Sequence, residues 1–307
     1  MILSAPKRSA LKRNSRLQAE KGSSADERID LIGTSIIKTI KYSDHFSFPL
    51  TVSEIHLRLI SSKPCLRRQA CSLERVFKTL QLMLKSKMIQ QTQDYYHLLG
   101  KKSLVNQRIN HLKSSKPQLT RVKQLAHKLS HIPYIKAIYL TGSLAMNNSK
   151  NDSDIDFMII TQEGRLWTTR FILTAYTTFL GLRRTPGSQK FAGKLCLNLY
   201  LTPDSYLLPT HKQSLYTAYE LIQAVPVYDP EGTRTALLAD NPWISSHLPN
   251  FVLPAKSAAT QEYRKTGILE YLMFNLQYLY MRKKLTREYI TINSAFFHPH
   301  DPSPQGL

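Results

Sequence analysis

The chain has 307 residues, of which 42% are hydrophobic and 21% charged, a composition typical of a soluble protein with room for two domains. It contains no run of about 18 consecutive uncharged apolar residues, so we expect no membrane-spanning helix. The formal net charge is +21, and residues 1–135 carry 25 Lys and Arg against 8 Asp and Glu. This charge favours a nucleic-acid partner for residues 1–135, although a merely soluble basic surface explains it equally well.

Residues 1–27 predict a disordered basic tail. Basic side chains stand among Ser, Ala and Asn, with almost no apolar content to bury and without the apolar core of a secretory signal. The three cysteines, Cys65, Cys71 and Cys196, are odd in number and show no Cys-x-x-Cys spacing. A reduced, cytoplasmic compartment is the simplest interpretation.

Residues 28–102 predict a winged helix-turn-helix. Apolar residues recur at helical spacing in three stretches, and the second stretch begins with a capping box from Thr51 to Glu54. Two short β-like runs then form a hairpin. The expected elements are helices over residues 29–40, 51–60 and 72–87 and strands over residues 88–91 and 95–99.

If this winged helix reads DNA, its third helix would enter the major groove, as in other helix-turn-helix proteins. Winged helices also serve as protein-packing modules, and the same cations can form an ordinary solvated helix face. The side chains expected to face DNA are Arg75, Lys78 and Lys85, with Arg67, Arg68, Lys101 and Lys102 for phosphates.

A polar, basic linker over residues 101–116, expected to be helical, leads into an amphipathic helix whose apolar residues run from Leu119 to Leu129. Pro133 ends this helix. The apolar run over residues 135–141 then predicts the first strand of a sheet.

Two apolar strands flank the polar stretch that carries the candidate chemistry. The first strand ends at Gly142 and Ser143, and the second begins with Asp154 and Asp156. Because alternate residues of a strand share a face, we expect both carboxylates to point together. Such a pair suits a hard divalent ion, Mg²⁺ or Mn²⁺, that also binds phosphate oxygens. Gly142 lets the backbone approach a ligand without a Cβ, and Ser143 opens a short helix that faces an anion.

The Gly142-Ser143 pair, a ten-residue spacer and Asp154-x-Asp156 resemble the signature of the polymerase-β-like nucleotidyltransferase superfamily. The resemblance spans about residues 118–225. It implies a small mixed sheet flanked by helices, two carboxylates that hold Mg²⁺ on a nucleoside triphosphate, and a Gly-Ser pair that grips its phosphates. The order of elements also resembles bacterial winged-helix nucleotidyltransferase-domain proteins, which implies no substrate. The alternative is a solvated turn rich in capping residues.

Downstream, the sequence predicts a helix over residues 166–180 that packs on the sheet, with Arg170 near its start. Arg170 and Lys194 are candidate contacts to the nucleotide, unless these side chains are simply solvated. In the strand expected over residues 195–201, four leucines share one face and Asn198 lies on the other. The superfamily usually has its third carboxylate here, so Asn198 occupies that position. An amide can coordinate a metal but cannot accept a proton from a hydroxyl.

An amide in place of the third carboxylate allows three functional outcomes. The chain is a weakened two-carboxylate enzyme, an enzyme whose general base comes from another residue, or a site that binds nucleotide without turnover. For the second outcome Glu220 is the candidate, on a helix expected over residues 212–223, although such a Glu is often only solvated. Residues 224–258 predict an irregular connection. Residues 259–289 predict a long helix, whose part from 267 to 281 we expect to be buried.

These patterns together predict an α+β protein with an N-terminal winged helix, a small mixed-sheet nucleotidyltransferase core flanked by helices, and a helical C-terminal tail. The expected function is Mg-dependent transfer of a nucleoside monophosphate from a nucleoside triphosphate, with ATP as first candidate, to a hydroxyl of an acceptor, with release of pyrophosphate. The alternative is a catalytically weak or inactive nucleotide-binding regulator that binds DNA through its winged helix. The patterns identify neither the acceptor nor the oligomeric state. The expected domains are residues 1–27, 28–102, 103–230 and 231–307.

Overall fold

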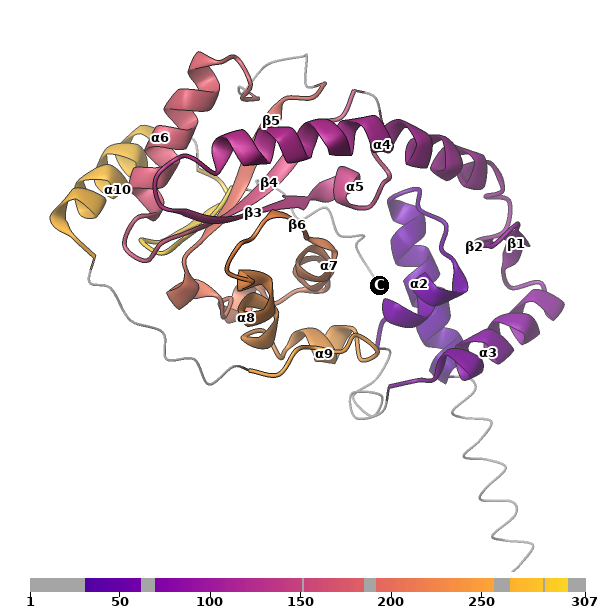
Figure 1. Cartoon of the computed structure of the whole chain (residues 1–307). Coiled ribbons are helices and arrows are strands. Elements are labelled where there is room, and N and C mark those ends of the chain that lie inside the picture. The colour runs from indigo at the N-terminus through magenta and orange to yellow at the C-terminus, as the bar shows by residue number, and fades with distance from the viewer. Residues whose placement is uncertain are drawn as a thin grey trace, which may run out of the picture.

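The computed structural model describes residues 31–61, 70–150, 152–184, 192–256, 266–283 and 285–297. It confirms the α+β class and a mixed sheet flanked by helices. The long helix α4 (Ser103–Leu129) runs from an N-terminal unit, formed by the described residues before it, across a sheet unit formed by the described residues after it (Figure 1). The predicted tail over residues 1–27 lies outside the described residues.

Six strands of the described chain form the central sheet, in the order β6, β3, β4, β5, β8, β7. β4 and β5 run parallel, and the other neighbouring strands are antiparallel. The antiparallel pairing of β3 with β4 brings the end of β3 beside the start of β4, where Thr141 pairs with Asp156. The strands are β3 (Ile135–Thr141), β4 (Ile155–Thr161), β5 (Leu195–Leu201), β6 (Val225–Tyr228), β7 (Tyr289–Ile290) and β8 (Ser294–Phe296).

Alternating side chains of β4 build a separate hydrophobic core on each face of the sheet. Ile155, Phe157 and Ile159 pack on the face that α4 and α6 cover, whereas Met158 and Ile160 pack on the face of α7, α8 and α9. A register slip of one residue would exchange the two sets, so burial on both faces determines the register. The helices are α6 (Leu166–Phe179), α7 (Leu215–Gln223), α8 (Thr233–Ala239), α9 (Ile244–His247) and α10 (Ile268–Met281).

Two sequence predictions are wrong in detail, and a third is extended. The helical linker expected over residues 101–116 and the amphipathic helix after it form one helix, α4, which continues through Pro117. The stretch expected to be irregular, residues 224–258, contains β6, α8 and α9. The expected long helix ends at Met281, and Tyr289 lies in β7, because β7 and β8 form a hairpin that pairs with the edge of β5. The C-terminal region therefore contributes strands to the sheet.

α10 was expected to be a buried helix, but its two buried residues are Glu270 and Gln277, and it exposes most of its apolar side chains. Glu270 accepts hydrogen bonds from the backbone N–H groups of Trp167 and Thr168, at 2.5 and 3.1 Å, in the first turn of α6. Gln277 accepts a bond from Arg170 at 2.5 Å. A carboxylate is favourable at a helix N-terminus, so polar contacts hold α10 on α6. The exposed apolar residues include Ile268, Leu269, Leu272, Leu276 and Leu279. Among the described residues, no helix is both long and apolar enough to cross a membrane.

In its described part, the N-terminal unit contains three helices followed by a hairpin around a core of its own. The predicted capping box of Thr51 and Glu54 is present. Leu50 forms an antiparallel bridge to Tyr96, which adds a third segment to the hairpin. Phe77, in the third of these helices, is 46% exposed. The elements are a helix over residues 31–45, α2 (Val52–Leu57), α3 (Leu73–Lys85), β1 (Gln90–Thr92) and β2 (Tyr95–His97).

The N-terminal unit packs firmly on the sheet unit. The ring of Tyr42 stacks on Tyr219 of α7, with the centroids 4.5 Å apart. The Tyr219 hydroxyl donates to the backbone carbonyl of Arg58 at 2.8 Å. The side chain of Asn250 bonds to both the N–H and the carbonyl of Cys71, at 2.7 and 3.1 Å. Tyr42 also belongs to the core on the α7 face of the sheet, so the two units share that core.

Candidate functional site

The two carboxylates of the motif lie beside the Gly-Ser bend. Asp154 directly precedes β4, and Asp156 lies within it on the same face as Met158. Gly142 has φ +67°, a backbone conformation that L side chains rarely adopt. A Cβ at Gly142 would overlap Oδ2 of Asp156 and lie 3.0 Å from its Cγ. The absence of a side chain at Gly142 therefore lets the carboxylate of Asp156 lie against the bend.

Cys196 of β5 completes a cluster with the two acids. It pairs with Asp156 in the parallel register of β4 and β5. One ligand atom from each of Asp154, Asp156 and Cys196 lies within 4.8 Å of the others. Burial and then the neighbouring charges of Asp156 and Asp154 raise the pKa of the Cys196 thiol to about 12, so it stays protonated at neutral pH. Mg²⁺ and Mn²⁺ prefer hard oxygen ligands to sulfur, so the candidate ligands here are the carboxylate oxygens.

Asn198 is the extra residue of a β-bulge. The register of β5 with β4 shifts between Leu197 and Leu199 and leaves Asn198 without a paired residue. Leu197 packs on the α6 face of the sheet, whereas Leu199 packs on the opposite face. The expectation that the four leucines share one face is therefore wrong, because a bulge shifts the alternation by one residue.

The bulge turns the side chain of Asn198 towards the acids. Its Nδ2 donates to Oδ1 of Asp156 at 3.1 Å. Its Oδ1 is buried and accepts no hydrogen bond from any described residue. Two carboxylates and one unsatisfied amide oxygen are hard oxygen donors, which fit Mg²⁺ or Mn²⁺ better than a soft metal.

Asp154 forms an ion pair with Arg184 at 2.6 Å. The pair is not enclosed, because the side chains of Arg184 and Asp154 are 43% and 20% exposed. Burial lowers the pKa of Arg184, but the hydrogen bond and the charge of Asp154 outweigh it and raise this pKa. A partly exposed pair of this kind contributes about 0–1 kcal/mol, so a divalent ion can compete with Arg184 for the carboxylate.

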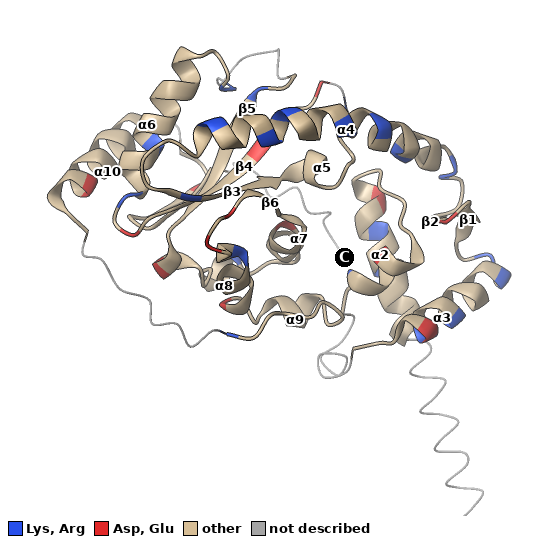
Figure 2. Cartoon of the chain, viewed as in Figure 1, with Lys and Arg blue, Asp and Glu red and all other residues tan. Residues whose placement is uncertain are grey.

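The helix α4 is basic, and one of its arginines lies near the acids. α4 carries no Asp or Glu, and Figure 2 shows Lys and Arg along its length. Arg121 of α4 reaches Gly193, whose N–H donates to Ser153 beside the acids. The exposed cations of α4 are Lys113, Lys116, Arg121, Lys123 and Lys128.

Two of the sequence-predicted side chains bond to groups other than the acids. Arg170 is buried between α6 and α10, and its guanidinium lies 4.4 Å from the ring centroid of Phe297. It packs with α6 on the face of the sheet opposite to Asp156. The ammonium of Lys194 donates to the carbonyl of Gly181, just beyond the C-terminal end of α6.

A cavity of about 520 Å³ opens beside Gly142 and Ser143, between the two units. This volume lies within the range of roughly 300–1,000 Å³ that is usual for ligand sites. Glu220 of α7 lines the cavity, as do aromatic side chains of both units. The structure thus brings Gly142, Ser143, Asp154, Asp156 and Asn198 together and places Glu220 in the adjoining cavity.

Sequence reasoning did not assign Cys196, Arg58 or Arg121 to this region. The signal for Cys196 was available, since it lies two residues before Asn198 in a strand. The sequence holds no signal for Arg58, which meets the Gly-Ser region through a contact between residues 88 positions apart.

Comparison with known families gives one match. Residues 123–183 match the family described as Polymerase beta, Nucleotidyltransferase. The matched region runs from the second half of α4 through β3, α5 (Gly142–Ala145) and β4 to just beyond α6. No curated protein and no solved structure matches the chain.

Proposed function

We propose that the chain, whose residues 123–183 match the family described as Polymerase beta, Nucleotidyltransferase, transfers a nucleoside monophosphate from a nucleoside triphosphate to an acceptor hydroxyl, releasing pyrophosphate. The observation that carries the proposal is the packing of Asp156 against Gly142, with Asp154 in the same cluster. ATP is the first candidate for the donor. Because Cys71 and Cys196 are free thiols, we assign the protein to the cytoplasm.

In this proposal Asp154 and Asp156 hold Mg²⁺ or Mn²⁺, with the amide oxygen of Asn198 as a further donor. The bound ion would neutralise negative charge on the triphosphate. Gly142 and Ser143 bind the phosphates, so that the reacting groups are held in line. Asn198 cannot accept a proton, and Glu220 in the adjoining cavity is the candidate base for the acceptor hydroxyl.

The alternative is a catalytically weak or inactive nucleotide-binding regulator that binds DNA. Asn198 in place of a carboxylate supports it, as do the three helices and hairpin of the N-terminal unit, which we interpret as a winged helix. Its third helix, α3, exposes Arg75, Lys78 and Lys85. Against a DNA role, Lys78 pairs with Glu74 at 2.6 Å, and Phe77 is exposed on the same helix.

Incubation with labelled ATP, CTP, GTP and UTP in Mg²⁺ tests the enzyme. Transfer that disappears in Asp154→Ala and Asp156→Ala, but persists in Asp152→Ala, supports the proposal, since Asp152 is an exposed acid of the same loop. Nucleotide binding without transfer to any acceptor favours the regulator. Salt-dependent DNA binding that is lost in Arg75→Ala with Lys78→Ala would support the DNA role.

A further inference from the structure

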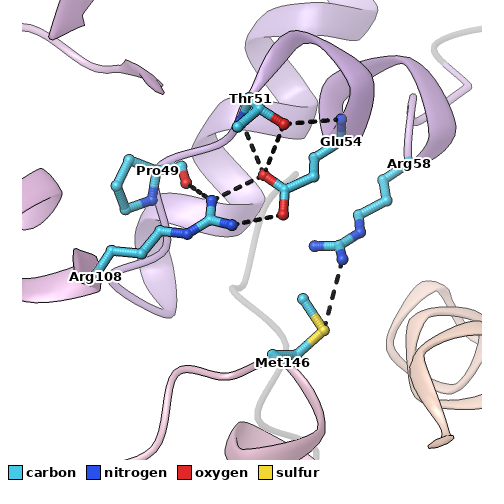
Figure 3. Close-up of polar contacts among 6 residues, drawn as sticks. All are labelled: Pro49, Thr51, Glu54, Arg58, Arg108 and Met146. Atoms are coloured by element: carbon cyan, nitrogen blue, oxygen red, sulfur yellow. Dashed lines mark hydrogen bonds and ion pairs between the residues drawn. The ribbon is translucent and has the colours of Figure 1, made fainter. Parts of the chain in front are cut away.

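Arg58 follows α2 and lines the cavity between the two units. Figure 3 shows its side chain near Glu54 and directed towards Met146. Among the described residues, its guanidinium makes one hydrogen bond, to Sδ of Met146 at 3.7 Å. Met146 directly follows α5, the short helix that starts at Gly142. A thioether is a weak acceptor, so most of the five guanidinium N–H donors have no acceptor in the described part of the chain. Burial lowers the pKa of Arg58, which indicates a cation deprived of much of its hydration.

The nearest carboxylate does not satisfy Arg58. Glu54 accepts two bonds from Arg108, at 2.6 and 2.8 Å, and two from the N–H and hydroxyl of Thr51, at 2.9 and 3.1 Å. Arg108 also donates to the carbonyl of Pro49, which holds it in this position (Figure 3). The negative charge of Glu54 therefore acts on Arg58 through space, while the carboxylate oxygens of Glu54 are hydrogen-bonded to Arg108 and Thr51.

The remaining charges of the cavity favour an anion. Lys150 lines it together with Arg58, and Glu220 is the one acid among the described lining residues. Gly142 and Ser143 also line the cavity, and the proposed function places the triphosphate at these two residues. Arginine presents a planar fork of donors that matches a phosphoryl group in two parallel hydrogen bonds.

We propose that Arg58 binds a phosphoryl group of the ligand in this cavity, so that the N-terminal unit supplies one wall of the nucleotide site. The inference rests on the proposed function, because it takes the ligand to be a phosphate ester bound at Gly142 and Ser143. The phosphoryl group belongs either to the donor triphosphate or to a phosphorylated acceptor. Both sources present the same chemistry to Arg58.

Calorimetric titration of the full chain in Mg²⁺ tests this, with ATP, tripolyphosphate, AMP and inorganic phosphate as probes. Arg58→Met keeps the apolar stem and removes the donors. We expect it to weaken binding of at least one probe roughly ten- to hundredfold, the usual loss for a hydrogen bond to a charged group. Arg282→Met is the matched control, since Arg282 is exposed directly after α10, which packs on the α6 face of the sheet and does not line the cavity.

The pattern of losses identifies the source of the phosphoryl group. Weaker binding of ATP and tripolyphosphate assigns Arg58 to the donor, and weaker binding of AMP and phosphate alone assigns it to the acceptor. Unchanged binding of every probe by folded Arg58→Met overturns this inference and leaves the proposed function standing. A wild-type chain that binds no nucleotide overturns both.

A measurement on the wild-type chain covers the case in which Arg58→Met does not fold. Phenylglyoxal modifies accessible arginines, and mass spectrometry reports the rate at each position. We expect ATP or AMP to slow modification of Arg58 at least severalfold and to leave Arg282 unaffected. Equal rates at Arg58 with and without either nucleotide would overturn the inference.

Discussion

Replacing Gly142 with alanine separates the role of the bend from ordinary backbone strain. Gly142 has φ +67°, and its missing Cβ is the space that Asp156 occupies. Gly232 has φ +65° but no atom within 4 Å of its would-be Cβ. Gly232→Ala therefore imposes the same backbone strain without the clash, and it is the matched control.

The expected magnitudes follow from these two contributions. A left-handed conformation costs an L-residue about 1–2 kcal/mol, so both variants should lose that much stability. In Gly142→Ala the carboxylate of Asp156 must also turn away, which breaks its bond from Asn198 at 3.1 Å. A bond to a charged group contributes about 1.5–3 kcal/mol. A displacement of about 1 Å at a reacting centre can lower the rate roughly a hundredfold.

Urea denaturation and transfer of labelled nucleotide measure the two effects separately. We expect Gly232→Ala to keep transfer activity near the wild-type level and Gly142→Ala to lose it about a hundredfold, with weaker Mn²⁺ binding. The reasoning would be refuted by a Gly142→Ala protein whose stability, Mn²⁺ affinity and transfer rate all match those of Gly232→Ala.

Three further predictions follow from the described contacts. Arg184→Met should change the stability by less than about 1 kcal/mol and raise Mn²⁺ affinity in calorimetry, because it releases Asp154; a fall in affinity would contradict this. Asn198→Asp should lower the melting temperature of the metal-free protein, because a third carboxylate repels the other two acids. Mg²⁺ should restore the melting temperature of this variant by binding the three acids. A melting temperature that does not change with Mg²⁺ would count against the site. Glu54→Gln should cost about 3–5 kcal/mol in urea denaturation, since it breaks a largely buried pair with Arg108. Burial raises the pKa of Glu54, but the hydrogen bond and charge of Arg108 outweigh it and hold this pKa below its usual 4.5. The stability that Glu54 contributes is therefore present above about pH 4.5 and lost as the pH falls through the lowered pKa, and the variant should lack this acid-side loss; identical pH profiles would disprove it.

Local patterns in the sequence were sufficient to predict the strands that carry and flank the two acids. The predicted strands over residues 135–141 and 195–201 have the bounds of β3 and β5. The alternation of β4 placed Phe157 and Asp156 on opposite faces, as the two hydrophobic cores require. The capping box at Thr51 is also present. These features depend on neighbours within a few residues, because strand alternation and helix capping are local properties of the backbone.

Only the tertiary structure decided which groups meet at the site. The bulge at Asn198 arises from pairing between β4 and β5, and no periodicity in β5 alone reveals it. α10 buries Glu270 instead of its apolar side chains because Glu270 accepts a hydrogen bond at the N-terminus of α6, which is far away in sequence. Arg58 reached the cavity because the N-terminal unit packs against α7. Each of these outcomes depends on long-range contacts that bury a polar group beside a specific partner, and residue spacing along the chain carries no information about such contacts.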